Sequence, residues 1–164
     1  MKRTPLERRM IARRLRRKAL GPCRTAPTTV HPTGQSIPVS TRYGIRGTRW
    51  MLGYHTGEDY ACPVGSQAVA VTWGTVLAAG STSWGPAYGT MVVIRTASGR
   101  YDYAYCHLSH VLVTVGQKVR PGTLVGLTGD TGNVTGPHLH FEARTAGGRY
   151  GSDVSPRKVR RSRL

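Results

Sequence analysis

From residue 40 onward, the chain consists of short runs of apolar residues separated by glycines. These runs lack the 3.6-residue apolar period of an amphipathic helix and have the length and β-branched content of strands. The pattern predicts an all-β domain over residues 40–156, with strands at 68–79, 90–97, 100–108, 111–115, 123–127 and 138–144. Ser98-Gly99 indicates a tight hairpin, and Arg120-Pro121-Gly122 indicates a second turn.

The residues before this domain follow two other patterns. Thr4-Pro5-Leu6-Glu7 combines a capping residue, a proline at the first helical position and a capping-box acid. Apolar residues then recur at helical spacing among arginines until Gly21-Pro22, so the pattern predicts a short basic helix over residues 1–21. Four prolines in residues 22–39 predict a linker without regular structure.

The glycines of the domain also form a weak internal repeat, of the kind found in sandwiched half-barrels. Biotin and lipoyl carrier domains share this spacing, and they need a lysine at an exposed hairpin tip. Lys118 is the only lysine between residues 25 and 156. Its neighbours Gln117 and Val119 do not resemble the carrier motif, so a carrier function is not favoured.

The formal net charge of +17 is concentrated at the two ends of the chain. Residues 1–24 carry +9, residues 157–164 carry +5, and the long middle carries only +3. We therefore treat residues 157–164 as a basic C-terminal tail. Basic tails of this kind favour contacts with anionic polymers of the cell surface, and nucleic acid is a less favoured partner.

Other features exclude several classes of protein. Three cysteines at unrelated spacings indicate neither a disulfide framework nor a cysteine-based zinc site. A bridge between Cys62 and Cys106 stays open, with buried free thiols favoured. No run approaches the roughly 18 apolar residues of a membrane-spanning helix, and the basic N-terminus has no apolar signal-peptide segment.

Candidate chemistry lies in two short motifs that contain histidine. On a strand, His138 and His140 would point to the same face because they are two residues apart. His55 and Asp59 could converge if the chain turns at Gly57. Two imidazoles and a carboxylate suit zinc, and catalytic zinc sites use three protein ligands, so His55, Asp59 and one residue of the 138/140 pair would make such a set.

Peptide hydrolysis also needs groups that move a proton and stabilise an oxyanion. His107 and the second histidine of the 138/140 pair are available for these roles. His31 and His110 are expected to be ordinary surface residues. Three aromatic residues are candidates either for the wall of a binding cleft or for the core: Tyr54, Trp84 and Tyr88.

Three motifs together resemble the M23 family of metallopeptidases, of the lysostaphin and LytM type. They are His55-x-x-x-Asp59, Tyr105-x-His107-Leu108 and Thr135-Gly136-Pro137-His138-Leu139-His140-Phe141, and the similarity runs from about Ser40 to Pro156. The resemblance implies an antiparallel sheet in a barrel-sandwich, the duplicated hybrid motif. It also implies one zinc ion bound by His55, Asp59 and His140, with His107 and His138 as the catalytic pair.

The same resemblance implies an endopeptidase that cuts a cross-bridge or stem peptide of bacterial peptidoglycan. We expect a monomer that acts on the bacterial cell wall. Without a visible signal peptide, a phage lytic protein fits best, either in the host cytoplasm before lysis or carried in the virion. The alternative is a non-catalytic polyanion-binding protein that keeps the fold as a scaffold.

Overall fold

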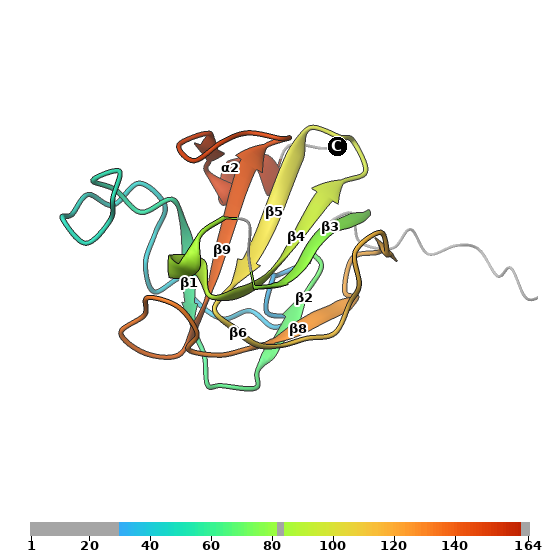
Figure 1. Cartoon of the computed structure of the whole chain (residues 1–164), viewed down its shortest axis with the longest axis horizontal. Helices are drawn as coiled ribbons and strands as arrows, with labels where there is room; N and C mark the ends of the chain where they lie inside the picture. Colours follow the sequence, from blue (N-terminus) through green and yellow to red (C-terminus); the bar gives the residue numbers. More distant parts are fainter. Residues whose placement is uncertain (1–29, 82–83, 162–164) are drawn as a thin grey trace, which may run out of the picture.

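The computed structural model describes residues 30–81 and 84–161, which form two antiparallel sheets (Figure 1). The larger sheet has the order β1-β9-β5-β4-β3-β7, with β10 also paired to β9, and the smaller has the order β2-β8-β6. The strands are β1 (Gly57–Ala61), β2 (Gln67–Val69), β3 (Gly74–Ser81), β4 (Thr90–Thr96), β5 (Tyr101–Cys106), β6 (Leu108–Val111), β7 (Lys118–Val119), β8 (Leu124–Thr128), β9 (His138–Thr145) and β10 (Asp153–Val154). Two short helical elements are described, η1 (Pro86–Tyr88) and α2 (Pro156–Arg161). The prediction of an all-β domain is confirmed.

Most of the predicted strands correspond to observed ones. The runs at 90–97, 123–127 and 138–144 are β4, β8 and β9. The run at 68–79 divides between β2 and β3, which belong to different sheets. The strand predicted at 111–115 is wrong, because β6 ends at Val111 and the next apolar side chains include the exposed Leu112 and Val115.

Both predicted turns are confirmed. Gly99 has a φ of 71° and its amide donates to the Thr96 carbonyl at 2.9 Å, which closes the hairpin between β4 and β5. Gly122 has a φ of 84°, and the Thr123 amide donates to the Arg120 carbonyl at 3.0 Å. These left-handed conformations explain the glycine at each turn.

The core contains side chains from both sheets, with Tyr60, Tyr105, Phe141 and Val125 at 0 % exposure. The Tyr105 hydroxyl accepts a hydrogen bond from the Val71 amide at 2.9 Å, so its polar end is satisfied inside the core. Cys62 and Cys106 are both buried free thiols, as favoured from the sequence. Burial raises the pKa of the Cys106 thiol well above its usual value, which makes the thiol unreactive.

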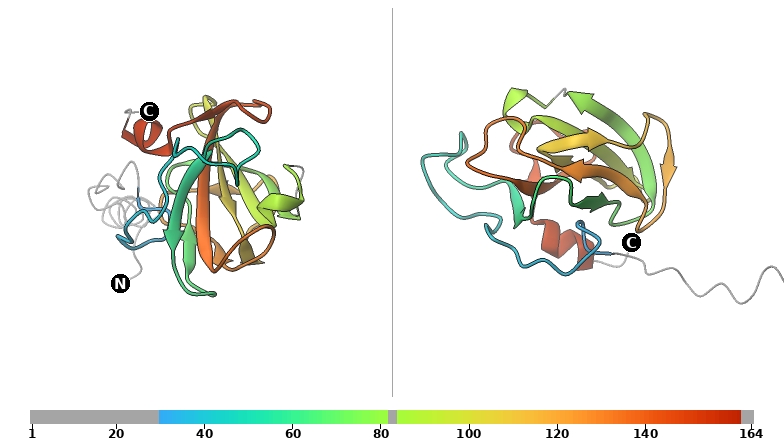
Figure 2. Two further views of the ribbon diagram at one scale, coloured as in Figure 1. Left: turned by 90° about the vertical axis from the view of Figure 1, so that its left-hand side faces the viewer. Right: turned by 90° about the horizontal axis from the view of Figure 1, so that it is seen from below.

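The described ends of the chain pack against the domain. Residues 30–39 form no helix or strand, but the Val30 amide donates to the Val71 carbonyl at 3.0 Å, and the Val69 amide donates to the Pro32 carbonyl at 2.7 Å. Figure 2 shows α2 beside this first segment, and the buried Val159 joins the core from α2. No helix was expected there from the sequence.

The predicted helix over residues 1–21 lies outside the described residues, as do residues 22–29 and 162–164. Within the described part of the chain, no helix has the length and apolar character needed to cross a membrane.

Candidate metal centre

The pairing of β1 with β9 brings the separate motifs together. Asp59 lies opposite His140 in this antiparallel register, and His55 is in the segment that leads into β1. Since β5 pairs with the other edge of β9, with Cys106 opposite His140, the next residue His107 also lies at this end of the sheet. The neighbouring strands β1, β9 and β5 therefore bring the candidate site residues to one end of the sheet.

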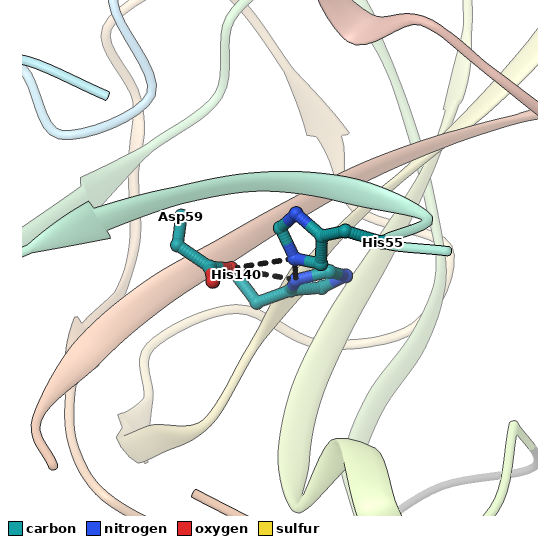
Figure 3. A group of neighbouring side chains, drawn as sticks. All are labelled: His55, Asp59 and His140. Carbon is teal, nitrogen blue, oxygen red and sulfur yellow. Dashed lines mark hydrogen bonds and ion pairs between the residues drawn. The ribbon is translucent and has the colours of Figure 1, made fainter. Parts of the chain in front are cut away.

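Ligand atoms from three side chains converge at this point (Figure 3). His55 Nε2 lies 3.0 Å and His140 Nδ1 lies 2.8 Å from Asp59 Oδ1, and the two nitrogens are 3.1 Å apart. Ligands about 2.0–2.1 Å from a tetrahedral zinc ion would be about 3.3 Å apart, so the spacing fits a single ion. The donor set of two imidazoles and one carboxylate fits zinc as well.

Hydrogen bonds on the far side of each imidazole orient it toward this point. His55 Nδ1 lies 3.1 Å from the Arg42 carbonyl, and a carbonyl can only accept, so Nδ1 carries a proton and Nε2 is the nitrogen left to bind a metal. His140 shows the reverse arrangement, with Nε2 against the Glu142 carboxylate and Nδ1 toward Asp59. The nitrogens that face Asp59 are thus Nε2 of His55 and Nδ1 of His140, and these are the candidate ligand atoms.

Without an ion, the charges of the cluster stabilise one another. Burial alone would raise the pKa of Asp59, but hydrogen bonds from His140 and His55 lower it far below its usual range. Burial alone would lower the pKa of His140, but hydrogen bonds to Asp59 and Glu142 raise it to about 9. A metal ion bound at this place would therefore have to displace a proton from His140.

Gly57 has a different role from the expected turn. It is the first residue of β1 and does not have a positive φ. A Cβ at this position would lie 2.6 Å from the Phe141 carbonyl oxygen and 2.7 Å from His140 Cε1. Glycine is required because the His140 ring packs directly on the backbone of β1.

Gly57→Ala should therefore damage the metal centre. The added methyl group has no space, so we expect a stability loss of about 1–3 kcal/mol, as for other overpacked sites. The displaced His140 ring should also weaken zinc binding, by about 10–100-fold if it behaves like other disturbed ligand supports. Thermal unfolding and zinc titration measure the two effects.

Gly136→Ala is the matched control, because a Cβ there meets nothing within 4 Å and Gly136 has no positive φ. This variant should unfold and bind zinc like the unmodified protein. Equal behaviour of the two variants would contradict the role given to Gly57.

Two further histidines border the cluster. The His107 and His138 rings are 4.7 Å apart, and the His107 and His140 rings are 5.9 Å apart. His107 Nδ1 donates to the Thr131 carbonyl at 2.8 Å and His138 Nδ1 donates to the Gly136 carbonyl at 2.9 Å, so both rings keep a bare Nε2. His138 Nε2 lies 3.7 Å from Asp59 Oδ1, on the side of the metal ligands.

His107 is held in an unusual backbone conformation. Its φ of 61° makes it the one non-glycine residue with a positive φ among residues 30–81 and 84–161. Such strain is found at functional sites, where the surrounding structure maintains it. Burial and the charge of His140 lower the pKa of His107 to about 4, so its ring is neutral at neutral pH.

Comparison with known proteins identifies the family. Residues 53–155 match peptidase family M23. The chain belongs to this family. Among its relatives, the peptidoglycan DD-endopeptidase ShyA of Vibrio cholerae is 44% identical over 88 residues, which are 54% of this chain and 20% of ShyA. The glycyl-glycine endopeptidase ALE-1 of Staphylococcus capitis is 37% identical over 102 residues, or 62% of this chain and 26% of ALE-1.

A solved structure extends the similarity to the fold. The catalytic domain of the antimicrobial peptidase lysostaphin from Staphylococcus simulans superposes with a TM-score of 0.70 at 28% identity. The match covers 77% of this chain and 93% of that domain. This M23 chain thus shares the fold of that lysostaphin domain, and it spans only about a fifth to a quarter of the curated relatives described above.

The remaining predicted residues of this M23 domain lie outside the ligand cluster. His110 is exposed, as expected, whereas His31 is half-buried and packs edge-on against Tyr60. The aromatic candidates make polar contacts: the Tyr54 hydroxyl donates to Asp153, the Tyr88 hydroxyl donates to Glu142, and Trp84 stacks on Arg144. The contacts of Tyr88 and Trp84 lead to His140 through Glu142 and Arg144, whereas the Tyr54 contact joins the residue before His55 to β10.

A separate hollow of about 670 Å³ lies on the other face of β1. Glu58 and Tyr60 point into it because they alternate with Asp59 along the strand. Three arginines also line it: Arg42, Arg157 and Arg160. No carboxylate of the described chain lies within ion-pair distance of these three arginines. This second depression of the M23 domain is basic and distinct from the metal centre.

Proposed function

We propose that the protein is a zinc-dependent endopeptidase that hydrolyses peptide bonds in bacterial peptidoglycan. The convergence of His55, Asp59 and His140 in an M23 chain is the observation that carries this proposal. The named activities of ShyA and ALE-1 support peptidoglycan as the substrate. They differ in the bond they cut, so the proposal covers either a cross-bridge or a stem peptide.

In this proposal, His55 Nε2, Asp59 Oδ1 and His140 Nδ1 hold one zinc ion. When bound, zinc lowers the pKa of a water molecule and polarises a carbonyl group. His107 and His138 supply the bare Nε2 atoms beside it. A neutral His107 can accept a proton from an attacking water, and together the two rings can donate hydrogen bonds to the oxyanion once protonated.

A wall-hydrolysis assay tests the function. Purified walls should lose turbidity with the protein, stop losing it after chelation, and resume when zinc is restored. Mass spectrometry of the released muropeptides should show new peptide termini and intact glycan bonds. Cleavage that continues after complete removal of metal, or products cut only in the glycan, would refute the proposal.

The basic segments support a second, compatible proposal: they bring the enzyme to anionic polymers of the bacterial surface. The specific observation is the basic hollow, which is lined by Arg42, Arg157 and Arg160, and the sequence adds a net charge of +9 in residues 1–24. Within the described residues, three arginines are thus gathered on one face. Screening by salt should weaken this attraction.

Removal of residues 1–24 tests the targeting proposal and leaves the packed residues 30–39 in place. Binding to walls at low salt should weaken, its salt dependence should flatten, and cleavage of a small soluble peptide should be unchanged. Unaltered wall binding would refute targeting. If peptide cleavage were absent throughout while wall binding needed these residues, the non-catalytic polyanion-binding alternative would be favoured.

A further inference from the structure

A buried carboxylate lies directly behind the metal centre. Glu142 is two residues after His140 on β9, so the two side chains share a face of the sheet, and Glu142 is 0 % exposed. Its Oε2 lies 3.2 Å from His140 Nε2 and accepts hydrogen bonds from the Thr56 hydroxyl at 2.6 Å and the Tyr88 hydroxyl at 3.1 Å. Its Oε1 accepts from Arg144 Nε at 2.6 Å.

Arg144 fixes this carboxylate from the opposite side. Arg144 is 3 % exposed, its Nη2 donates to the Tyr88 hydroxyl at 2.8 Å, and its guanidinium carbon lies 3.6 Å from the centre of the Trp84 ring. The guanidinium is thus held by a hydrogen bond and by stacking on an aromatic face. With both oxygens engaged, Glu142 cannot turn away from His140.

The arrangement decides which nitrogen of His140 can bind a metal. A carboxylate surrounded by hydroxyl and guanidinium donors can only accept, so His140 Nε2 must donate its proton to Glu142. When a metal displaces the second ring proton, the proton held by Glu142 stays on Nε2 and the lone pair forms on Nδ1, which lies beside Asp59 and His55. A ring proton on Nδ1 would point into the ligand cluster and prevent binding.

We propose that Glu142, held by Arg144, is the positioning residue that fixes the ring orientation and tautomer of His140 for metal binding through Nδ1. The proposal rests on the zinc site of the proposed function. It adds to that site a chain of contacts from His140 through Glu142 to Arg144. Arg144 in turn contacts Trp84 and Tyr88, in the segment joining β3 to β4.

Glu142→Gln tests the proposal with little change in volume. The Gln amide can donate to His140 Nε2 and so favour the tautomer that cannot bind metal. Zinc affinity, measured by competition with a coloured chelator, should fall by about 10–100-fold, the range typical for loss of an outer partner of a metal ligand. An affinity within twofold of the unmodified protein would overturn the proposal.

Asp102→Asn is the matched control. Asp102 is also a buried carboxylate paired with an arginine, Arg95, and it lies opposite Arg144 in the β5–β9 register without touching His140. Its zinc affinity should stay within twofold of the unmodified protein. An equal loss in both variants would show a general effect of charge removal and overturn the specific role of Glu142.

A second measurement uses the unmodified protein, so it tests the tautomer of His140 even if Glu142→Gln fails to fold. In ¹⁵N NMR spectra of the zinc-loaded, unmodified protein, His140 should carry its proton on Nε2 and bind metal through Nδ1. The opposite assignment would overturn the proposal. Neither measurement uses a wall substrate, so a protein that binds zinc in this way but leaves walls intact would refute the proposed function alone.

Discussion

His140→Ala should remove zinc binding and wall hydrolysis together. His140 provides one of the three converging ligand atoms and lies between Asp59 and Glu142. Loss of an outer partner of a metal ligand already costs about 10–100-fold in affinity, so loss of the ligand itself should exceed that range. Metal analysis of the purified variant should find far less than one zinc per chain, and added zinc should not restore turbidity loss.

The folding of His140→Ala needs its own measurement, because the His140 ring lies between the carboxylates of Asp59 and Glu142. Without it, the buried Glu142 and the partly buried Asp59 lose a partner, which should lower the thermal stability of the metal-free protein. His110→Ala is a suitable control, since His110 is exposed and outside the cluster. A folded His140→Ala protein that retains stoichiometric zinc and cuts walls would exclude His140 as a ligand.

The sequence predicts most of the sheet because its central strands are rich in apolar and β-branched residues. β4 and β9 are recognisable in this way. β1 is not, because Gly-Glu-Asp-Tyr-Ala has two acids and no continuous apolar run. Its residues serve two different sites: Asp59 faces the metal centre, while Glu58 and Tyr60 face the basic hollow. Burial by tertiary contacts overrides its weak strand propensity.

The candidate metal ligands could be proposed from sequence motifs, but the buried side chains that hydrogen-bond around His140 could not. The alternation of His138 and His140 predicts a shared face without any structure. Glu142 follows the same alternation, which is the one sequence signal for its position. Its partners Thr56 and Tyr88 lie 86 and 54 residues away along the chain, so only the pairing of β1, β9 and β5 reveals the network.

The break between β5 and β6 is also a tertiary feature. The run at 100–108 reads as one strand, yet the chain turns at His107 with a φ of 61°. Histidine is more common at positive φ than most non-glycine residues, but Cys106-His107-Leu108 contains no glycine or asparagine, so these residues give only a weak signal for this turn. The turn aims the His107 ring at the metal ligands, and its amide donates to the Tyr88 carbonyl at 3.0 Å. Strain at this point is typical of functional sites and agrees with the proton-transfer role proposed for His107.

His107→Ala should therefore separate catalysis from metal binding. His107 is not one of the three ligand atoms, so the variant should keep one zinc ion per chain. Because the neutral ring is positioned to accept a proton, its loss should lower kcat by about 10²–10⁴-fold, the usual contribution of a general acid or base. Turnover of a soluble peptide substrate and metal analysis of the same sample measure both quantities.

His110→Ala, three residues further along, is again the control and should keep both zinc and turnover, because His110 is exposed on β6. The pair of variants also decides between the two functional classes considered for this fold. A non-catalytic polyanion-binding protein would have no use for a strained histidine beside a metal cluster, so His107→Ala would leave its function intact. A fall in turnover with zinc retained and wall binding unchanged is expected only of an enzyme whose proton transfer depends on His107.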